Sequence, residues 1–121
     1  MRRILVVDDE PDVAELMRLF LGLLGYEADI FPSCEESLKA VGEKRYWAVF
    51  CDYMMPKITG DLLYREVKAL DSALAGRFVL ITGAMLDEHL ESFLQSERVK
   101  VISKPFNLGE IKKTLAEMEA V

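Results

Sequence analysis

Five polar side chains stand at or just after the ends of four apolar runs in this sequence: Asp8, Asp9, Asp52, Thr82 and Lys104. Carboxylate oxygens are the ligands that Mg²⁺ prefers in proteins. A hydroxyl and an ammonium group are suited to binding phosphoryl oxygens beside such a metal. If these groups meet in the fold, they have the composition needed for phosphoryl transfer to a carboxylate, which gives an aspartyl phosphate.

Among the three carboxylates, Asp52 is the predicted nucleophile. It is the single acidic residue of its apolar run, whereas Asp8 and Asp9 form a pair better suited to binding the metal. Two unit charges ~4 Å apart repel by about 4 kcal/mol at an effective dielectric near 20, so converging carboxylates indicate a cation between them. The alternative for each acid, and for Thr82, is a helix cap, and the alternative for Lys104 is a surface cation.

An alternation of apolar runs and helical patterns positions these residues. Continuous apolar runs predict strands buried on both faces over residues 4–7, 46–51 and 78–81. Residues 99–102 are also predicted as a strand, and residues 27–31 as a weaker strand nearer an edge of the sheet. Each run is followed by apolar residues at helical spacing, which predicts five helices. We therefore expect an α/β, flavodoxin-like (βα)5 fold, with a five-stranded parallel sheet of order 2-1-3-4-5 and helices on both faces. The ends of strands one and three would then flank the ligand crevice.

The helical spacing also predicts which positions face the core. In the first helix Leu16 faces inward, whereas Leu19 and Leu23 lie off the apolar stripe. These two are either buried against neighbours or available to a helical partner. Leu70 belongs to the inward face of the third helix, and Gly42 ends the second.

Length, charge and cysteine content limit the function classes. The 121 residues suit one domain, 1–121. A net charge of −6 without a basic block argues against direct binding of nucleic acid or anionic membrane, and no stretch approaches the ~20 apolar residues of a membrane span. Cys34 and Cys51 lack metal or disulfide spacing, which favours a reducing cytoplasm. His89, the single histidine, is expected to be solvated on its helix.

The order and spacing of the motifs resemble the response-regulator receiver domain of two-component signalling over nearly the whole chain. The matching pieces are Asp8-Asp9, Asp52-x-x-Met55-Pro56-x-x-x-Gly60, Thr82 and Lys104-Pro105-Phe106. The resemblance implies that Asp52 takes a phosphoryl group from a phosphohistidine, carried by a sensor histidine kinase or a histidine phosphotransfer domain. It also implies that the phosphorylated pocket shifts a conformational equilibrium, which a partner or an output domain reads.

Residue roles follow from the same resemblance. It implies Mg²⁺ bound by Asp9, Asp52 and the backbone carbonyl of Met54, with Asp8 helping directly or through water. Thr82 would be the switch hydroxyl, Lys104 the phosphoryl-binding lysine, and Lys104-Pro105 a cis peptide.

Two positions depart from the family pattern. Val101 stands where an aromatic residue often reports phosphorylation, and Gly83 stands where alanine is more usual. The acceptor chemistry should survive both changes, whereas output through the usual aromatic residue is not expected. Met54 and Ala84 are predicted to flank the path of water to the phosphoryl group, and neither offers a base. We therefore expect a chain that catalyses only its own phosphorylation and slow dephosphorylation, and is not an enzyme acting on other substrates.

Two other functions fit parts of the pattern. A Mg²⁺-dependent hydrolase of the haloacid-dehalogenase type needs a second Asp two residues after the nucleophile, and that position is Met54. A docking module with a vestigial site is favoured by the loss of an acidic residue, Thr82 or Lys104, and none is lost. Whether the chain works alone or is part of a hybrid kinase or a longer regulator stays open.

Overall fold

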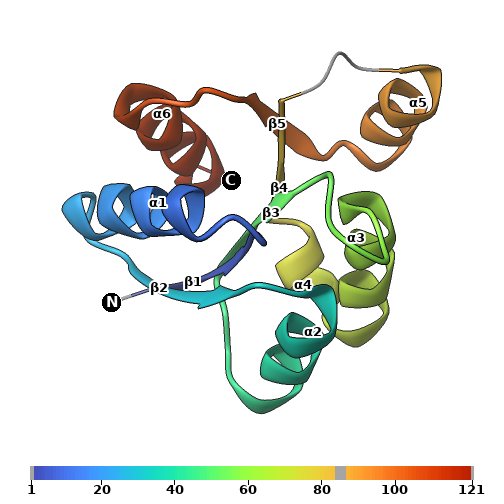
Figure 1. The fold of residues 1–121 in the computed structure, drawn as a ribbon, viewed down its shortest axis with the longest axis horizontal. Helices are drawn as coiled ribbons and strands as arrows, with labels where there is room; N and C mark the ends of the chain where they lie inside the picture. Colours follow the sequence, from blue (N-terminus) through green and yellow to red (C-terminus); the bar gives the residue numbers. More distant parts are fainter. Residues whose placement is uncertain (1, 84–86, 121) are drawn as a thin grey trace.

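The fold is a five-stranded parallel sheet between two layers of helices. The computed structural model describes residues 2–83 and 87–120. The strands are β1 (Arg3–Val7), β2 (Glu27–Phe31), β3 (Ala48–Asp52), β4 (Phe78–Thr82) and β5 (Lys100–Ser103). They pair in parallel in the order β2-β1-β3-β4-β5, which confirms the predicted topology (Figure 1).

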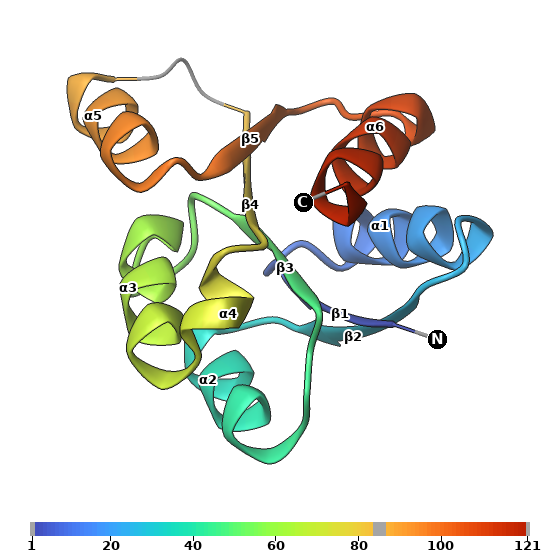
Figure 2. The same cartoon turned by 180° about the vertical axis from the view of Figure 1, so that it is seen from behind.

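Six helices connect and cover the strands in the described residues. They are α1 (Pro11–Leu23), α2 (Cys34–Glu43), α3 (Gly60–Leu70), α4 (Ser72–Ala75), α5 (Glu88–Glu97) and α6 (Leu108–Glu119). Side chains of α1 and α6 pack on one face of the sheet, and side chains of the other four helices pack on the opposite face (Figures 1 and 2). None of the helices in the described residues combines the length and the apolar character that crossing a membrane requires.

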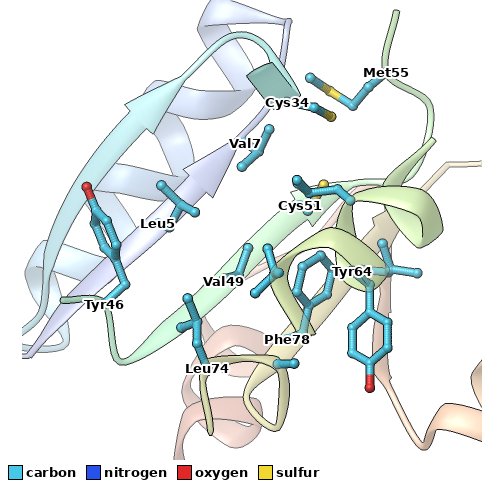
Figure 3. Close-up of a cluster of buried hydrophobic side chains, with 14 of the residues drawn as sticks. Leu5, Val7, Cys34, Tyr46, Val49, Cys51, Met55, Tyr64, Leu74 and Phe78 are labelled. Carbon is cyan, nitrogen blue, oxygen red and sulfur yellow. The ribbon is translucent and has the colours of Figure 1, made fainter. Parts of the chain in front are cut away.

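Side chains of alternate residues in the central strands pack in two separate hydrophobic cores, one on each face of the sheet. Val6 and Phe50 belong to the core beneath α1 and α6, and the next residues, Val7 and Cys51, belong to the core beneath the other helices. Figure 3 shows Val7 and Cys51 in this second core, together with Met55 from the loop after β3. Burial on both faces explains why β1, β3 and β4 are continuous apolar runs in the sequence.

The structure corrects several details of the helical prediction. The short helix α4 was not predicted, and Asp71 caps it by accepting a hydrogen bond from the backbone N–H of Leu74 at 3.1 Å. Gly42 lies inside α2 and does not end it. Leu16 and Leu70 are exposed, contrary to the prediction that they face inward. Leu16 lies on the exposed side of α1 with Leu19 and Leu23, and Leu70 is the last residue of α3.

The turn after β3 depends on a close approach at Gly60. The backbone N–H of Gly60 donates to the carbonyl of Tyr53 at 2.9 Å, which closes the loop 53–59. A Cβ atom at Gly60 would lie 2.5 Å from Cδ2 of Leu80 and 3.1 Å from the carbonyl oxygen of Asp52. Gly60 therefore allows α3 to begin directly against the end of β3.

Gly60→Ala is expected to destabilise the protein by about 2 kcal/mol, because Leu80 is buried in the core and the Asp52 carbonyl is fixed backbone. Gly42→Ala is the matched control. Its Cβ would meet nothing within 4 Å, so it should stabilise α2 by roughly 0.5–1 kcal/mol. Urea unfolding measures both changes, and equal stability of Gly60→Ala and the parent chain would contradict the close approach.

Candidate functional site

The candidate site lies at the carboxyl end of the sheet, between β1 and β3. Val7 of β1 pairs with Cys51 of β3, so the residues that follow, Asp8 and Asp52, leave adjacent strands side by side. Both carboxylates are buried. Glu10 joins them from the turn before α1, and one carboxylate oxygen from each of the three residues lies within 4.8 Å of the others.

Lys104 is the cation of this cluster. Its Nζ atom lies 3.2 Å from Glu10 Oε1, 3.3 Å from Asp52 Oδ2 and 3.9 Å from Asp8 Oδ2. The backbone places it there, because the N–H of Lys104 donates to the carbonyl of Thr82 at 2.8 Å. The Lys104–Pro105 peptide bond is cis, as the resemblance implies.

Without a further cation, the surroundings of the cluster disfavour the charged forms of Asp8 and Asp52. Burial raises the pKa of Asp8 to about 6, and the charge of Asp52 adds to this, against a hydrogen bond from the backbone N–H of Glu10. Burial also raises the pKa of Asp52, although Lys104 opposes the shift. For Lys104, burial lowers the pKa but the attraction of Asp52 and Asp8 outweighs it, and the net direction is upward. One ammonium group therefore compensates three carboxylates only in part.

This imbalance fits a divalent cation. The donor set consists of hard carboxylate oxygens, which suit Mg²⁺. Glu10 lies with Asp8 and Asp52 in this cluster, and the Asp9 side chain is exposed. The metal-ligand role of Asp9 stays a prediction. Asp9 acts on the site through its charge, which contributes to the raised pKa of Asp52. Glu10 was missed in the sequence, where Asp8, Asp9 and Glu10 form an unbroken acidic run before Pro11.

The other predicted site residues described by the structure lie on the loop after β3 and on β4 and β5. The backbone N–H of Met54 donates to Asp52 Oδ1 at 3.4 Å, and the Met54 side chain is 63% exposed. Thr82 is buried at the end of β4, one residue beyond Ile81, the strand partner of Asp52. Val101 lies on β5 beside Leu80 and is partly exposed. The prediction for Ala84 falls outside the described residues.

His89 is exposed on α5, as predicted, and it also has a side-chain contact. Its Nε2 atom lies 3.0 Å from Oδ2 of Asp61, which is buried at the start of α3. No local pattern in the sequence indicates this pair, because the two residues lie on different helices.

Comparison with known sequences shows relatives over almost the whole chain. The profile of the response regulator receiver domain matches residues 4–116. The transcriptional regulatory protein RprY of Bacteroides fragilis is 30% identical over 109 residues, which are 90% of this chain and 45% of RprY. The sensor histidine kinase RcsC of Salmonella typhi is 32% identical over 113 residues, which are 93% of this chain and 12% of RcsC. The chain thus spans less than half the length of the curated relatives RprY and RcsC.

Comparison with solved structures agrees with the sequence profile. The response regulator TrrA of Thermotoga maritima, in complex with Mg²⁺–BeF, has a TM-score of 0.84 and 34% identity, with 98% of this chain and 99% of TrrA covered. A second structure holds TrrA in complex with the histidine kinase ThkA, with a TM-score of 0.83, 31% identity and 98% of both chains covered. With the profile match over residues 4–116, these likenesses show that the chain belongs to the response regulator receiver domain family.

Proposed function

We propose that the chain is the phospho-acceptor receiver of a two-component phosphorelay and that Asp52 carries the phosphoryl group. The observation that carries the proposal is the position of Asp52, buried at the end of β3 within 3.3 Å of the Lys104 ammonium. In the reaction a carboxylate oxygen of Asp52 forms a bond to phosphorus while the N–P bond of the partner's phosphohistidine breaks. The electron pair of that bond stays on the imidazole nitrogen, which takes a proton from solvent.

The surrounding groups have distinct proposed roles. The ammonium group of Lys104, which pairs with the Asp52 carboxylate, would pair with the phosphoryl oxygens after the transfer. Thr82 supplies a hydroxyl at the end of the neighbouring strand. Asp8, Glu10 and Asp52, which lie together, are candidate ligands of Mg²⁺. The resemblance to receiver domains adds Asp9 and the backbone carbonyl of Met54 as candidates. When bound, Mg²⁺ would offset the charge between the nucleophile and the phosphoryl oxygens.

The proposed partner is a sensor histidine kinase or a histidine phosphotransfer domain. Leu16, Leu19 and Leu23 form a stripe on α1, spaced by about one helical turn, and they are 41%, 58% and 66% exposed. An exposed apolar stripe of this kind suits a helical partner. The TrrA–ThkA complex supports a kinase as the partner class. A cytoplasmic setting fits the two buried free thiols, Cys34 and Cys51.

Phosphorylation would act on a pre-existing equilibrium of the fold. A phosphoryl group adds about −1.5 to −2 charges at neutral pH and so rearranges the ion pairs of Lys104. Because Val101 is not aromatic, a ring at this position cannot relay the change. Any output domain or effector protein would read another surface, and the site offers no reason for direct nucleic acid binding.

Beryllofluoride, a phosphoryl mimic, tests the proposal. Because the carboxylates of the site are poorly compensated, millimolar Mg²⁺ should raise the melting temperature, and beryllofluoride should raise it further only when Mg²⁺ is present. Beryllofluoride that binds equally well without Mg²⁺, or does not bind at all, would contradict the phosphoryl site. A chromogenic phosphoester incubated with the same protein should show no turnover, because Met54 offers no proton for a hydrolase.

Dephosphorylation should be slow, with a half-life of minutes or longer in Mg²⁺. The exposed side chain nearest the acceptor along the chain is Met54, which cannot orient or deprotonate a water molecule. Met54→Glu places a base at this position and should shorten the half-life, whereas Met54→Leu should leave it unchanged. The lifetime is read as loss of label from the isolated phosphoprotein, and decay of the parent within seconds would contradict the prediction.

A further inference from the structure

Arginine side chains gather around Trp47 at the amino ends of the strands. They line an open hollow of about 390 Å³, in which Glu27 is the only acidic residue among the described residues. The arginines of this lining are Arg2, Arg3, Arg45 and Arg77. The chain as a whole has a net charge of −6, so the hollow is a local excess of positive charge. Like charges that gather in this way repel one another, and an anion relieves the repulsion.

The parallel sheet brings these residues to one edge. Arg3 is the first residue of β1, and Arg77 directly precedes β4. Trp47, just before β3, donates its backbone N–H to the carbonyl of Arg3 at 2.7 Å, and the carbonyl of Arg77 accepts from the N–H of Val49 at 2.9 Å. All five strands run in the same direction, so the functional site at their carboxyl ends lies at the opposite edge of the sheet (Figure 1).

The Trp47 ring orients two of the guanidinium groups. The Cζ atom of Arg2 lies 4.4 Å from the ring centroid, and that of Arg77 lies 5.5 Å from it. The Nε atom of Arg77 also donates to the backbone carbonyl of Trp47. Tyr26 stacks with the same indole, with the ring centroids 5.7 Å apart. A guanidinium held against an aromatic ring keeps N–H donors at its edge, so these two groups are pre-organised to bind an anion.

One carboxylate of the chain already binds at this edge. Glu119, the last residue of α6, pairs with the guanidinium of Arg2. The same carboxylate accepts a hydrogen bond from the Tyr26 hydroxyl at 2.8 Å. The side chains around the indole can therefore accommodate a carboxylate and satisfy it with both a charged and a neutral donor.

The other arginines differ in their partners. Arg3 pairs with Glu27 at 2.6 Å and with Asp29 at 2.8 Å. Arg45 and Arg77, in contrast, pair with no carboxylate in the part of the chain that the structure describes. The Arg45 side chain is also exposed. Two guanidinium groups of the hollow are thus available to carboxylates from another molecule.

We propose that the Arg–Trp surface, formed by Arg2, Arg45, Trp47 and Arg77, binds an acidic segment of a partner protein. Tryptophan, tyrosine and arginine are the residues that most often dominate binding energy at protein interfaces. The positive charge of the surface selects carboxylates, and the negative charge of the whole chain disfavours a long polyanion such as nucleic acid. Because the surface lies at the edge of the sheet opposite Asp52, this docking does not depend on phosphoryl transfer and holds the partner before and after it.

The first test titrates the chain with a hexaglutamate peptide blocked at both ends, and with the corresponding hexaglutamine peptide. Trp47 is the single tryptophan, so its fluorescence reports binding at this surface directly. Hexaglutamate should give a saturable change, and hexaglutamine should give none. The affinity should fall as the salt concentration rises from about 50 to about 300 mM, because salt screens exposed charges. No saturable binding of hexaglutamate at the lowest salt concentration would overturn the proposal.

Charge-removing variants locate the binding energy. Arg45→Gln and Arg77→Gln should each weaken hexaglutamate binding roughly two- to fivefold. Arg45 is exposed and has no contact to lose, so its variant tests the surface even if Arg77→Gln disturbs the fold near Trp47. The matched controls are Lys112→Gln and Lys113→Gln, which remove the same charge from the exposed side of α6 and should bind as the parent does. Equal weakening by the lysine and arginine variants would mean unspecific attraction and would contradict a defined surface.

Two further measurements separate this surface from the phosphoryl site and from a phosphate site. Amide chemical shifts should change at residues 2–3, 45–47 and 77 on addition of hexaglutamate, and changes confined to other residues would refute the assignment. Beryllofluoride with Mg²⁺ should leave the peptide affinity unchanged, so a failure of the proposed function does not affect this test. Inorganic tripolyphosphate is the second probe, because guanidinium groups also bind phosphate. Tripolyphosphate that binds more tightly than the peptide would assign the surface to a phosphate ligand and exclude the acidic protein segment.

Discussion

Asp52→Asn is expected to abolish phosphotransfer from a phosphohistidine donor. The amide has neither the charge nor the nucleophilic oxygen pair that the bond to phosphorus requires. The fold should persist, because an amide fits the same volume and its oxygen can still accept the hydrogen bond from the Met54 N–H. The measurement is transfer of radiolabel from a phosphorylated histidine kinase or phosphotransfer domain in Mg²⁺, and the expected result is no measurable label.

The matched control is Glu43→Gln, an exposed carboxylate at the end of α2, which should accept label as the parent does. Label that persists on Asp52→Asn would place the nucleophile elsewhere, and the nearest candidates are Asp8 and Glu10. Geometry disfavours Asp8, since it lies 3.9 Å from the Lys104 ammonium against 3.3 Å for Asp52. Glu10 is held at the exposed rim of the cluster.

The strands and the place of the site were predictable because each depends on a strong local signal. Strands buried on both faces must be continuous apolar runs, so Ile4–Val7 and Ala48–Cys51 are recognisable in the sequence. The sheet order then follows from the alternation of strands and helices. Once the order is known, the ends of β1 and β3 must meet, and this brings Asp8 to Asp52 without any knowledge of side-chain conformation.

Features that depend on side-chain direction or on distant neighbours were not predictable in the same way. Three consecutive acids follow β1, and the turn geometry decides that Glu10, rather than Asp9, gathers with Asp8. Helix α4 has only four residues, too few for a helical period. Leu16 is 41% exposed although it directly precedes the buried Met17, and the apolar pattern did not separate these two residues. The Asp61–His89 pair joins two helices, and nothing in either local sequence indicates the other.

Asp8→Asn is expected to stabilise the metal-free protein at pH 7.5 by about 2–3 kcal/mol, since a difference of one in pKa between the folded and unfolded states corresponds to about 1.4 kcal/mol. The pKa of Asp8 in the folded protein is about 6, raised from 3.8 mainly by burial. A raised pKa means that the folded state binds the proton more tightly than the unfolded chain does. The corresponding stability is present below about pH 3.8 and is lost as pH rises through about 6.

The stabilisation should therefore depend on pH in a defined sense. Urea unfolding in a metal chelator should show a large difference between Asp8→Asn and the parent at pH 7.5 and little difference near pH 4, where Asp8 is largely protonated in the folded protein. The Asn side-chain oxygen can still accept the hydrogen bond that Asp8 Oδ1 accepts from the Glu10 N–H at 2.9 Å, so this contact is kept. A variant that is less stable than the parent at pH 7.5 would contradict the unfavourable charge.

Mg²⁺ should stabilise the parent much more than it stabilises Asp8→Asn. The parent gains free energy of unfolding from Mg²⁺ because the cation compensates the charges of Asp8 and Asp52, and Asp8→Asn should gain much less. For the same reason the parent's affinity for Mg²⁺ should fall as pH drops through about 6, where Asp8 takes up its proton. The charge that destabilises the metal-free fold is thus the charge that binds the metal, so stability without Mg²⁺ and affinity for Mg²⁺ must change in opposite directions at this residue.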